Sequence, residues 1–140
     1  MKIVSEFVSL SGTEDLTLLA VRIILGTVMV YYGTLKIKDL KANAKFFDKI
    51  GFKPGAFWGF IVMIIDLFGG ILIVLGIYAG IFAALFGFQM ITGLIWKTTK
   101  TDKPFTDWSY NLILLALSLV IITFGPGKYS LNNVLFNLLV

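Results

Sequence analysis

The sequence contains no cysteine and no histidine. Without cysteine, the chain cannot form disulfides, zinc–thiolate sites, iron–sulfur clusters or a thiol nucleophile of its own. Without histidine, it lacks the commonest haem ligand and the usual general base. Electron transfer through a centre held by such ligands would therefore have to belong to another chain.

Charge is also scarce. Charged residues make up 14% of the 140 residues and apolar residues 58%, against about 25% and about 45–50% in soluble domains. So little polar surface cannot cover a water-soluble globule of this size, and the composition predicts an integral membrane protein. The length allows one domain, residues 1–140.

Four long apolar stretches of 17 to 21 residues follow one another along the chain. Each is long enough for a helix to cross a hydrocarbon core of about 30 Å. The runs are continuous instead of alternating, which excludes a membrane barrel. Buried helices of a soluble protein are the alternative, but lysine-rich connectors would leave no outer layer to bury them. The predicted fold is all-α, an integral membrane four-helix bundle, with spans at Leu16–Leu35, Phe57–Ile77, Tyr78–Trp96 and Trp108–Phe124.

The connector between the first two spans predicts an additional helix over residues 38–50. Its apolar residues recur at three- and four-residue steps, and lysines fill the other positions. This pattern is typical of an amphipathic helix lying in the headgroup layer. The second and third spans are joined by a very short glycine-flanked segment, which predicts a tight antiparallel hairpin.

Lysines are distributed unequally between the two sides of the predicted bundle. Nine lysines fall in the connectors after the first and third spans, and only Lys2 and Lys128 fall on the opposite side. Because basic loops stay in the cytoplasm, this bias predicts a multi-pass cell-membrane protein with both termini outside. Tyr31 and Tyr32, near the cytoplasmic end of the first span, fit the aromatic belt at that interface.

Two ionisable residues, Arg22 and Asp66, lie well inside spans. Each would cost about 2.5–3.5 kcal/mol near a helix centre facing lipid. Helix arithmetic places both, with Gln89 and Ser118, below the outer surface, so each helix contributes one polar group to a common layer. Two hypotheses stay open: Arg22 and Asp66 are mutual counter-ions that hold the bundle together, or the layer is a pocket, open toward the outer leaflet, for a small molecule or lipid headgroup.

Glycines accompany these charges on the same helix faces. In the first span they form a stripe with Arg22, and in the second they lie one turn beyond Asp66. Small residues there would admit a neighbouring helix or a ligand closely. The candidate residues of this region are Gly26, Gly33, Lys36, Gly69 and Gly70.

Three segments carry a resemblance to the DoxX family of small four-helix membrane proteins. The stretch from Arg22 to Lys36 resembles the family's opening arginine, glycine and His-Gly-x-x-Lys pattern. The stretch from Asp66 to Gly76 is similar to its Glu-x-x-Gly-Gly helix. The most specific segment resembles the terminal Gly-Pro-Gly-Arg-x-Ser-Leu-Asp motif and comprises Gly125, Pro126, Gly127, Lys128, Tyr129, Ser130, Leu131 and Asn132.

The sequence departs from that family pattern at three positions. Tyr32 occupies the position where the family pattern has histidine, Asp66 the position of glutamate, and Asn132 the position of aspartate. A carboxylate survives at position 66, but two titratable groups are lost, so a proton relay through those positions would not operate in this chain. Whether the protein is itself an enzyme is therefore left open.

The terminal motif has a structural and a functional interpretation. Gly125 to Gly127 can end the last helix, because proline cannot continue it and glycine can cap it. The residues that follow would lie just outside the membrane, above the polar layer. They predict a lid that folds back, with Ser130 and Asn132 near the outer end of the first helix and Lys128 facing anionic groups.

The resemblance implies a small membrane subunit associated with redox systems, since related chains belong to a thiosulfate:quinone oxidoreductase or accompany terminal oxidases or thiol-stress complexes. The preferred hypothesis is a subunit that carries no cofactor of its own and binds a quinone-like molecule or lipid, or docks a redox partner. A non-enzymatic assembly factor is the alternative, and a small transporter is disfavoured by the thin polar pathway. Membrane lipids, a partner membrane protein and further copies of the chain are the expected partners; nucleic acid is not.

Overall fold

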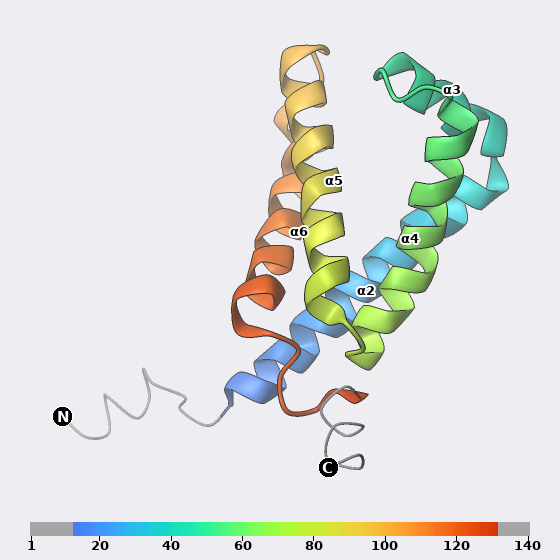
Figure 1. The fold of residues 1–140 in the computed structure, drawn as a ribbon. Helices are drawn as coiled ribbons and strands as arrows, with labels where there is room; N and C mark the ends of the chain where they lie inside the picture. Colours follow the sequence, from blue (N-terminus) through green and yellow to red (C-terminus); the bar gives the residue numbers. More distant parts are fainter. Residues whose placement is uncertain (1–12, 132–140) are drawn as a thin grey trace.

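In a computed structural model, which describes residues 13–131, the chain folds into a helical bundle (Figure 1). No strand occurs within this range. Four of the helices are long and apolar enough to cross a membrane, and a short one follows the first of them. The helices are α2 (Glu14–Lys38), α3 (Leu40–Lys49), α4 (Gly55–Leu75), α5 (Ala79–Thr99) and α6 (Phe105–Phe124). The predicted all-α membrane bundle is confirmed, and the observed span ends differ from the predicted ones by at most three residues.

Helices α2 and α4 approach each other most closely where two glycines face one another. A Cβ atom added to Gly26 would lie 2.4 Å from the backbone oxygen of Gly70, and one added to Gly70 would lie 2.7 Å from the oxygen of Gly26. Further along, Gly33 leaves room for Leu67 in the same way. These glycines let the two backbones meet, as small residues do between membrane helices. The structure therefore gives these glycines a role in packing α2 against α4.

Helices α5 and α6 form the second pair. Leu114 and Ile121 of α6 are buried against α5 residues such as Ala83 and Phe86. Phe86 and its neighbour Phe82 also reach across to α4, where a Cβ on Gly69 would lie 2.7 Å from the Phe82 ring. This contact joins the two helix pairs near the α4–α5 connection.

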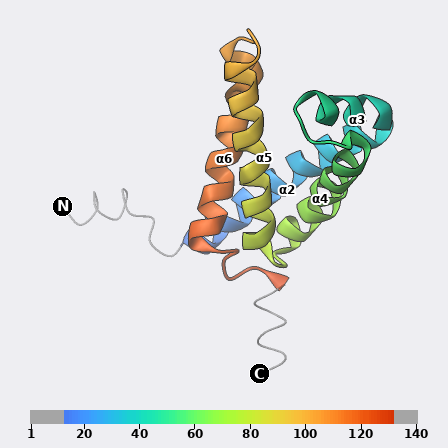
Figure 2. The same cartoon turned by 45° about the horizontal axis from the view of Figure 1, so that its top comes forward.

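The two pairs are held together at one end and separate toward the other. Only residues 76–78 connect α4 to α5, as the predicted hairpin requires, so these helices start close together and then diverge toward α3 (Figures 1 and 2).

The predicted connector helix is present as α3, and it is fastened to the start of α4. Asp48 accepts a hydrogen bond from the Gly55 amide (2.8 Å), and Asn43 donates one to the Gly59 carbonyl (3.0 Å).

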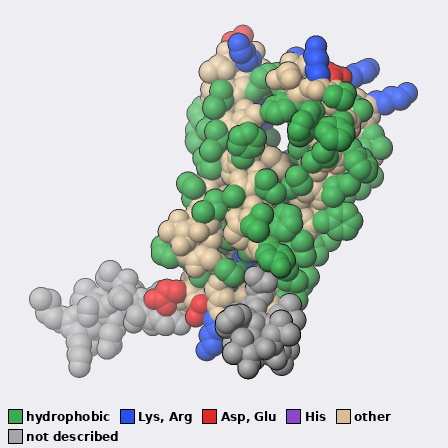
Figure 3. Space-filling model, viewed as in Figure 1, with side chains coloured by type: hydrophobic (Ala, Val, Ile, Leu, Met, Phe, Trp, Pro, Cys, Tyr) green, Lys and Arg blue, Asp and Glu red, His purple; other side chains and the backbone are tan. Residues whose placement is uncertain are grey.

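The basic residues gather at the α3 end of the bundle. Figure 3 shows lysine and arginine side chains in blue around this end and a band of hydrophobic side chains below it. Both lysine-rich connectors, 36–53 and 97–103, meet here, as the predicted topology requires. The assignment of this end to the cytoplasm stays a prediction.

Single cysteines in this cysteine-free chain test the orientation. Lys41→Cys lies on α3 and Tyr129→Cys lies beyond α6, and both positions are exposed. In intact cells, an impermeant maleimide should label position 129 and leave position 41 unlabelled until the cells are lysed, because basic connectors stay inside. Labelling of position 41 in intact cells, with position 129 protected, would reverse the topology.

Candidate ligand cavity

A cavity of about 370 Å³ lies between the two helix pairs, at the end where they diverge. All five helices or their connectors contribute to its wall. A hollow ringed by hydrophobic side chains is visible at this level in Figure 3. The volume falls within the range of about 300–1,000 Å³ that small-molecule sites occupy. Most of its wall is apolar, with aromatic rings at Phe46, Phe52, Trp58, Phe88 and Trp96.

The predicted position of the pocket is wrong. The cavity lies at the lysine-bearing end of the bundle, whereas one of the two hypotheses from the sequence placed a pocket at the opposite end. The physical cause is the short connection between α4 and α5, which together with the Gly69–Phe82 contact closes the bundle at that opposite end. Space between the pairs is left only where the helices separate.

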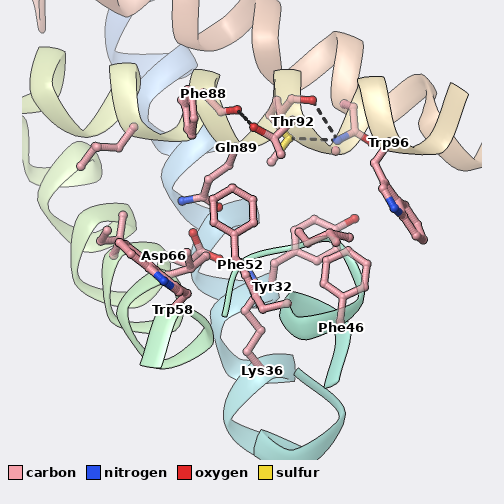
Figure 4. A pocket seen from close by; sticks show the side chains of 18 of the residues that line it. Tyr32, Lys36, Phe46, Phe52, Trp58, Asp66, Phe88, Gln89, Thr92 and Trp96 are labelled. Carbon is pink, nitrogen blue, oxygen red and sulfur yellow. Dashed lines mark hydrogen bonds and ion pairs between the residues drawn. The ribbon is translucent and has the colours of Figure 1, made fainter. Parts of the chain in front are cut away.

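An ion pair between Lys36 of α2 and Asp66 of α4 forms part of the wall of this cavity (Figure 4). The Lys36 ammonium donates to Asp66 Oδ2. The Asp66 side chain is fully buried, and that of Lys36 is 24% exposed. Because the two charges neutralise one another, the pair avoids most of the free-energy cost of placing charged groups in a low-dielectric span. The Gln89 side chain of α5 points toward the same carboxylate (Figure 4).

Arg22 does not pair with Asp66, so the predicted counter-ion pair is wrong. Its guanidinium donates instead to three backbone carbonyls: Pro126 (2.7 Å), Tyr129 (2.8 Å) and Val74 (3.3 Å). Val74 lies in the last turn of α4, where the helix dipole and unpaired carbonyls favour a cation. Arg22 therefore fastens the segment after α6 to α2 and to the last turn of α4, at the end of the bundle opposite α3.

The predicted common layer of four polar groups is not formed either. Of its members, only Asp66 and Gln89 meet, at the cavity. Ser118 is fully buried beside Gly87 of α5, and its hydroxyl donates to the Leu114 carbonyl one turn earlier (2.9 Å). A hydroxyl that bonds to its own helix leaves no unpaired donor and needs no ligand.

The terminal motif folds back as predicted, but it does not cover the cavity. The Lys128 amide donates to Asp15 Oδ1 (2.8 Å), and Ser130 is buried against Gly76, the left-handed residue that ends α4. Any side chain at position 76 would meet Ser130 and Arg22. The motif therefore closes the end of the bundle opposite α3, and its predicted role as a lid over a pocket is wrong because the cavity lies at the α3 end. Asn132 lies outside the described residues.

Several residues of the cavity were not singled out by the sequence. Tyr32, assigned to the interfacial belt, lines the cavity and stacks on Tyr110 of α6 with ring centroids 5.5 Å apart. Lys97 lies 4.1 Å from the centre of the Tyr110 ring, and its ammonium donates to the Tyr110 hydroxyl and to Asn111 Oδ1 (3.1 Å). Asn111 is a buried amide within a span, a signal that could have been found in the sequence.

The α3 helix narrows the entrance of the cavity. Phe46 packs edge-on against Trp96 of α5, with ring centroids 5.5 Å apart, and the Lys49 ammonium lies 5.4 Å from the centre of the same indole. These two contacts join α3 to α5 and, with the Tyr32–Tyr110 stack, connect the helix pairs at this level. Because both come from a short helix at the membrane surface, they place the entrance near the headgroups of the lysine-bearing side.

With this geometry established, comparison with known proteins gives the family. The sequence profile described as DoxX matches residues 17–97. The chain belongs to the DoxX family. The matched region includes Lys36, Asp66 and Gln89 and stops before α6 and the terminal motif. Family membership and the four apolar helices together make this DoxX protein a multi-pass membrane protein.

A curated relative of this DoxX protein comes from Bacillus subtilis (strain 168). It carries the name "Putative oxidoreductase CatD" and is 28% identical over 106 residues, which are 74% of this chain and 76% of the relative. No solved structure matches the chain.

The Lys36–Asp66 pair makes a prediction about stability. Asp66→Leu leaves the lysine unneutralised and should destabilise the protein in detergent by about 3 kcal/mol, the low end of the ~3–5 kcal/mol range for breaking a buried pair, because Lys36 is partly exposed. Adding Lys36→Met should restore much of that loss, which thermal unfolding measures.

The matched control combines Arg22→Met with Asp66→Leu. Because Arg22 bonds to the terminal segment and not to Asp66, these two losses should add. The opposite result would be additive losses of stability for Lys36→Met and Asp66→Leu, with Arg22→Met restoring the stability of Asp66→Leu. That result would show that Arg22, and not Lys36, is the cation that neutralises Asp66.

Proposed function

We propose that this DoxX protein is a ligand-binding membrane subunit of a redox system, and that the cavity between its helix pairs binds a quinone-class molecule. One observation carries the proposal: an ion pair with a fully buried aspartate lines a cavity walled largely by aromatic and aliphatic side chains. Ligand sites combine apolar walls with a few convergent polar groups in this way.

The residues of the cavity suit the head of a quinone. A flat ring can pack between aromatic side chains such as Phe52, Trp58 and Phe88. An ammonium has three protons and Lys36 uses one toward Asp66, so the others are available to a ligand oxygen. The amide of Gln89, on the facing helix, offers a further donor or acceptor.

The redox part of the proposal rests on two further points. The relative from Bacillus subtilis is named as an oxidoreductase, and this chain has neither cysteine nor histidine to hold a redox centre. A quinone carries its own redox chemistry, so the protein has to supply only the binding site and its orientation. The partner that exchanges electrons with the ligand would approach the lysine-bearing side, which we assign to the cytoplasm.

Quenching of tryptophan fluorescence tests the binding of a quinone in lipid nanodiscs. Trp58 and Trp96 line the cavity, whereas Trp108 packs against Phe105 away from it. In a Trp108→Phe background, 2-decyl-1,4-benzoquinone should quench the remaining emission and reach saturation. Val62→Phe, which fills the cavity from α4, should raise the apparent Kd at least tenfold.

Ile71→Phe is the matched control, since it adds similar bulk to α4 at a half-exposed position away from the cavity. Its quenching curve should match that of the parent. Quenching that rises linearly with quinone and is equal in both variants would mean that the quinone only dissolves in the lipid, and the proposal would fail.

A further inference from the structure

The two carboxylate oxygens of Asp66 have different surroundings. Oδ2 accepts from the Lys36 ammonium. Oδ1 is buried and accepts no hydrogen bond of ordinary geometry within the described residues, although the Gln89 side chain points toward this carboxylate. An ionised oxygen left in this state costs more than the about 1–3 kcal/mol of an unsatisfied neutral group, because charged groups lose more on desolvation. A fully buried acceptor without a donor therefore needs an explanation.

Asp66, the residue that carries this oxygen, lines the cavity. Within residues 13–131, the buried side-chain atoms without a hydrogen-bond partner are Arg22 Nε and Asp66 Oδ1, and of these two residues only Asp66 lines the cavity. Two other polar side chains of the wall have hydrogen bonds within the protein. Thr92 donates to the Phe88 carbonyl (2.9 Å), and Asn111 accepts from Lys97 (3.1 Å).

The charge of the pair restricts which donor can satisfy Oδ1. Lys36 already neutralises the carboxylate. A ligand ammonium would bring a second positive charge beside Lys36, which like-charge repulsion disfavours in a low-dielectric site. A neutral hydroxyl can donate to Oδ1 without this penalty, and hydrogen bonds from a neutral O–H to a carboxylate are short and strong.

We infer that the cavity selects amphiphiles whose aromatic head carries a free hydroxyl group, which donates to Asp66 Oδ1, over analogues in which that oxygen bears no proton. The inference rests on the proposed function and deepens it: among quinone-class ligands, the reduced, phenolic form binds more tightly. The aromatic wall favours a ring as the carrier of the hydroxyl, and Lys36 can donate to the same oxygen.

Two probes that differ only in this proton test the inference. These are 4-(8-bromooctyl)phenol and its methyl ether, whose bromine quenches the cavity tryptophans in nanodiscs of the Trp108→Phe protein. The phenol should bind at least tenfold more tightly than the ether, after both are corrected for partition into empty nanodiscs. Each binding curve should reach saturation and be weakened by Val62→Phe.

Variants separate the donor contact from general effects on the fold. The double variant Lys36→Met/Asp66→Leu keeps the site electrically neutral and should bring the phenol-to-ether ratio of affinities close to one. Ser118→Ala removes a buried hydroxyl that lies away from the cavity and should keep the parent ratio. A folded double variant, verified by its thermal transition, with an undiminished ratio would overturn the role of Asp66.

The remaining outcomes are distinguishable. Saturable binding of both probes with equal affinity would leave the cavity as a ligand site and overturn the hydroxyl selection, as expected if Gln89 satisfies Oδ1 in the membrane. Binding of neither probe, together with a linear quinone response, would remove the proposed function and the inference with it.

Discussion

The ion pair between Lys36 and Asp66 is the constraint on which the rest of the site depends. A carboxylate near the middle of a membrane helix can stay ionised only if a cation neutralises it. Lys36 comes from near the end of α2 and reaches back toward the interior, so its position requires α2 and α4 to be in close contact. The contact between Gly26 and Gly70 provides that approach, about three turns before Lys36 in α2 and about one turn after Asp66 in α4.

Arg22 and Lys36 stand at the two different ends of the bundle, one closed and one open. Arg22 bonds to carbonyls of α4 and of the segment after α6, which seals the end opposite α3 with backbone groups that would otherwise lack donors. At the opposite end the helix pairs separate, and α3 bridges them through Phe46 and Trp96. A rigid end beside a cavity with a surface helix at its entrance is an arrangement suited to taking up an amphiphile from the adjoining leaflet.

The sequence predicted the helices well because span length and the periodicity of α3 are local properties. Lys36, Asp66 and Gln89 were also among its candidates. It assigned the wrong partners because depth along a helix fixes only one coordinate. Arg22 and Asp66 come out at similar depths, yet tilt and rotation, set by the glycine contacts, bring Lys36 to the carboxylate instead. The aromatic wall could not be predicted, because Phe52, Trp58 and Trp96 resemble lipid-facing or interfacial residues until the helices are placed.

The central claim is that the cavity holds an apolar molecule with a hydroxyl-bearing head. Mass spectrometry of what co-purifies with the protein from native membranes tests it most directly, with Val62→Phe as the cavity-filled comparison. The account predicts an aromatic hydroxyl-bearing amphiphile near one per chain in the parent protein and its loss from the filled variant. A stoichiometric protein partner with no small molecule, unchanged by Val62→Phe, would contradict the account and favour an assembly factor.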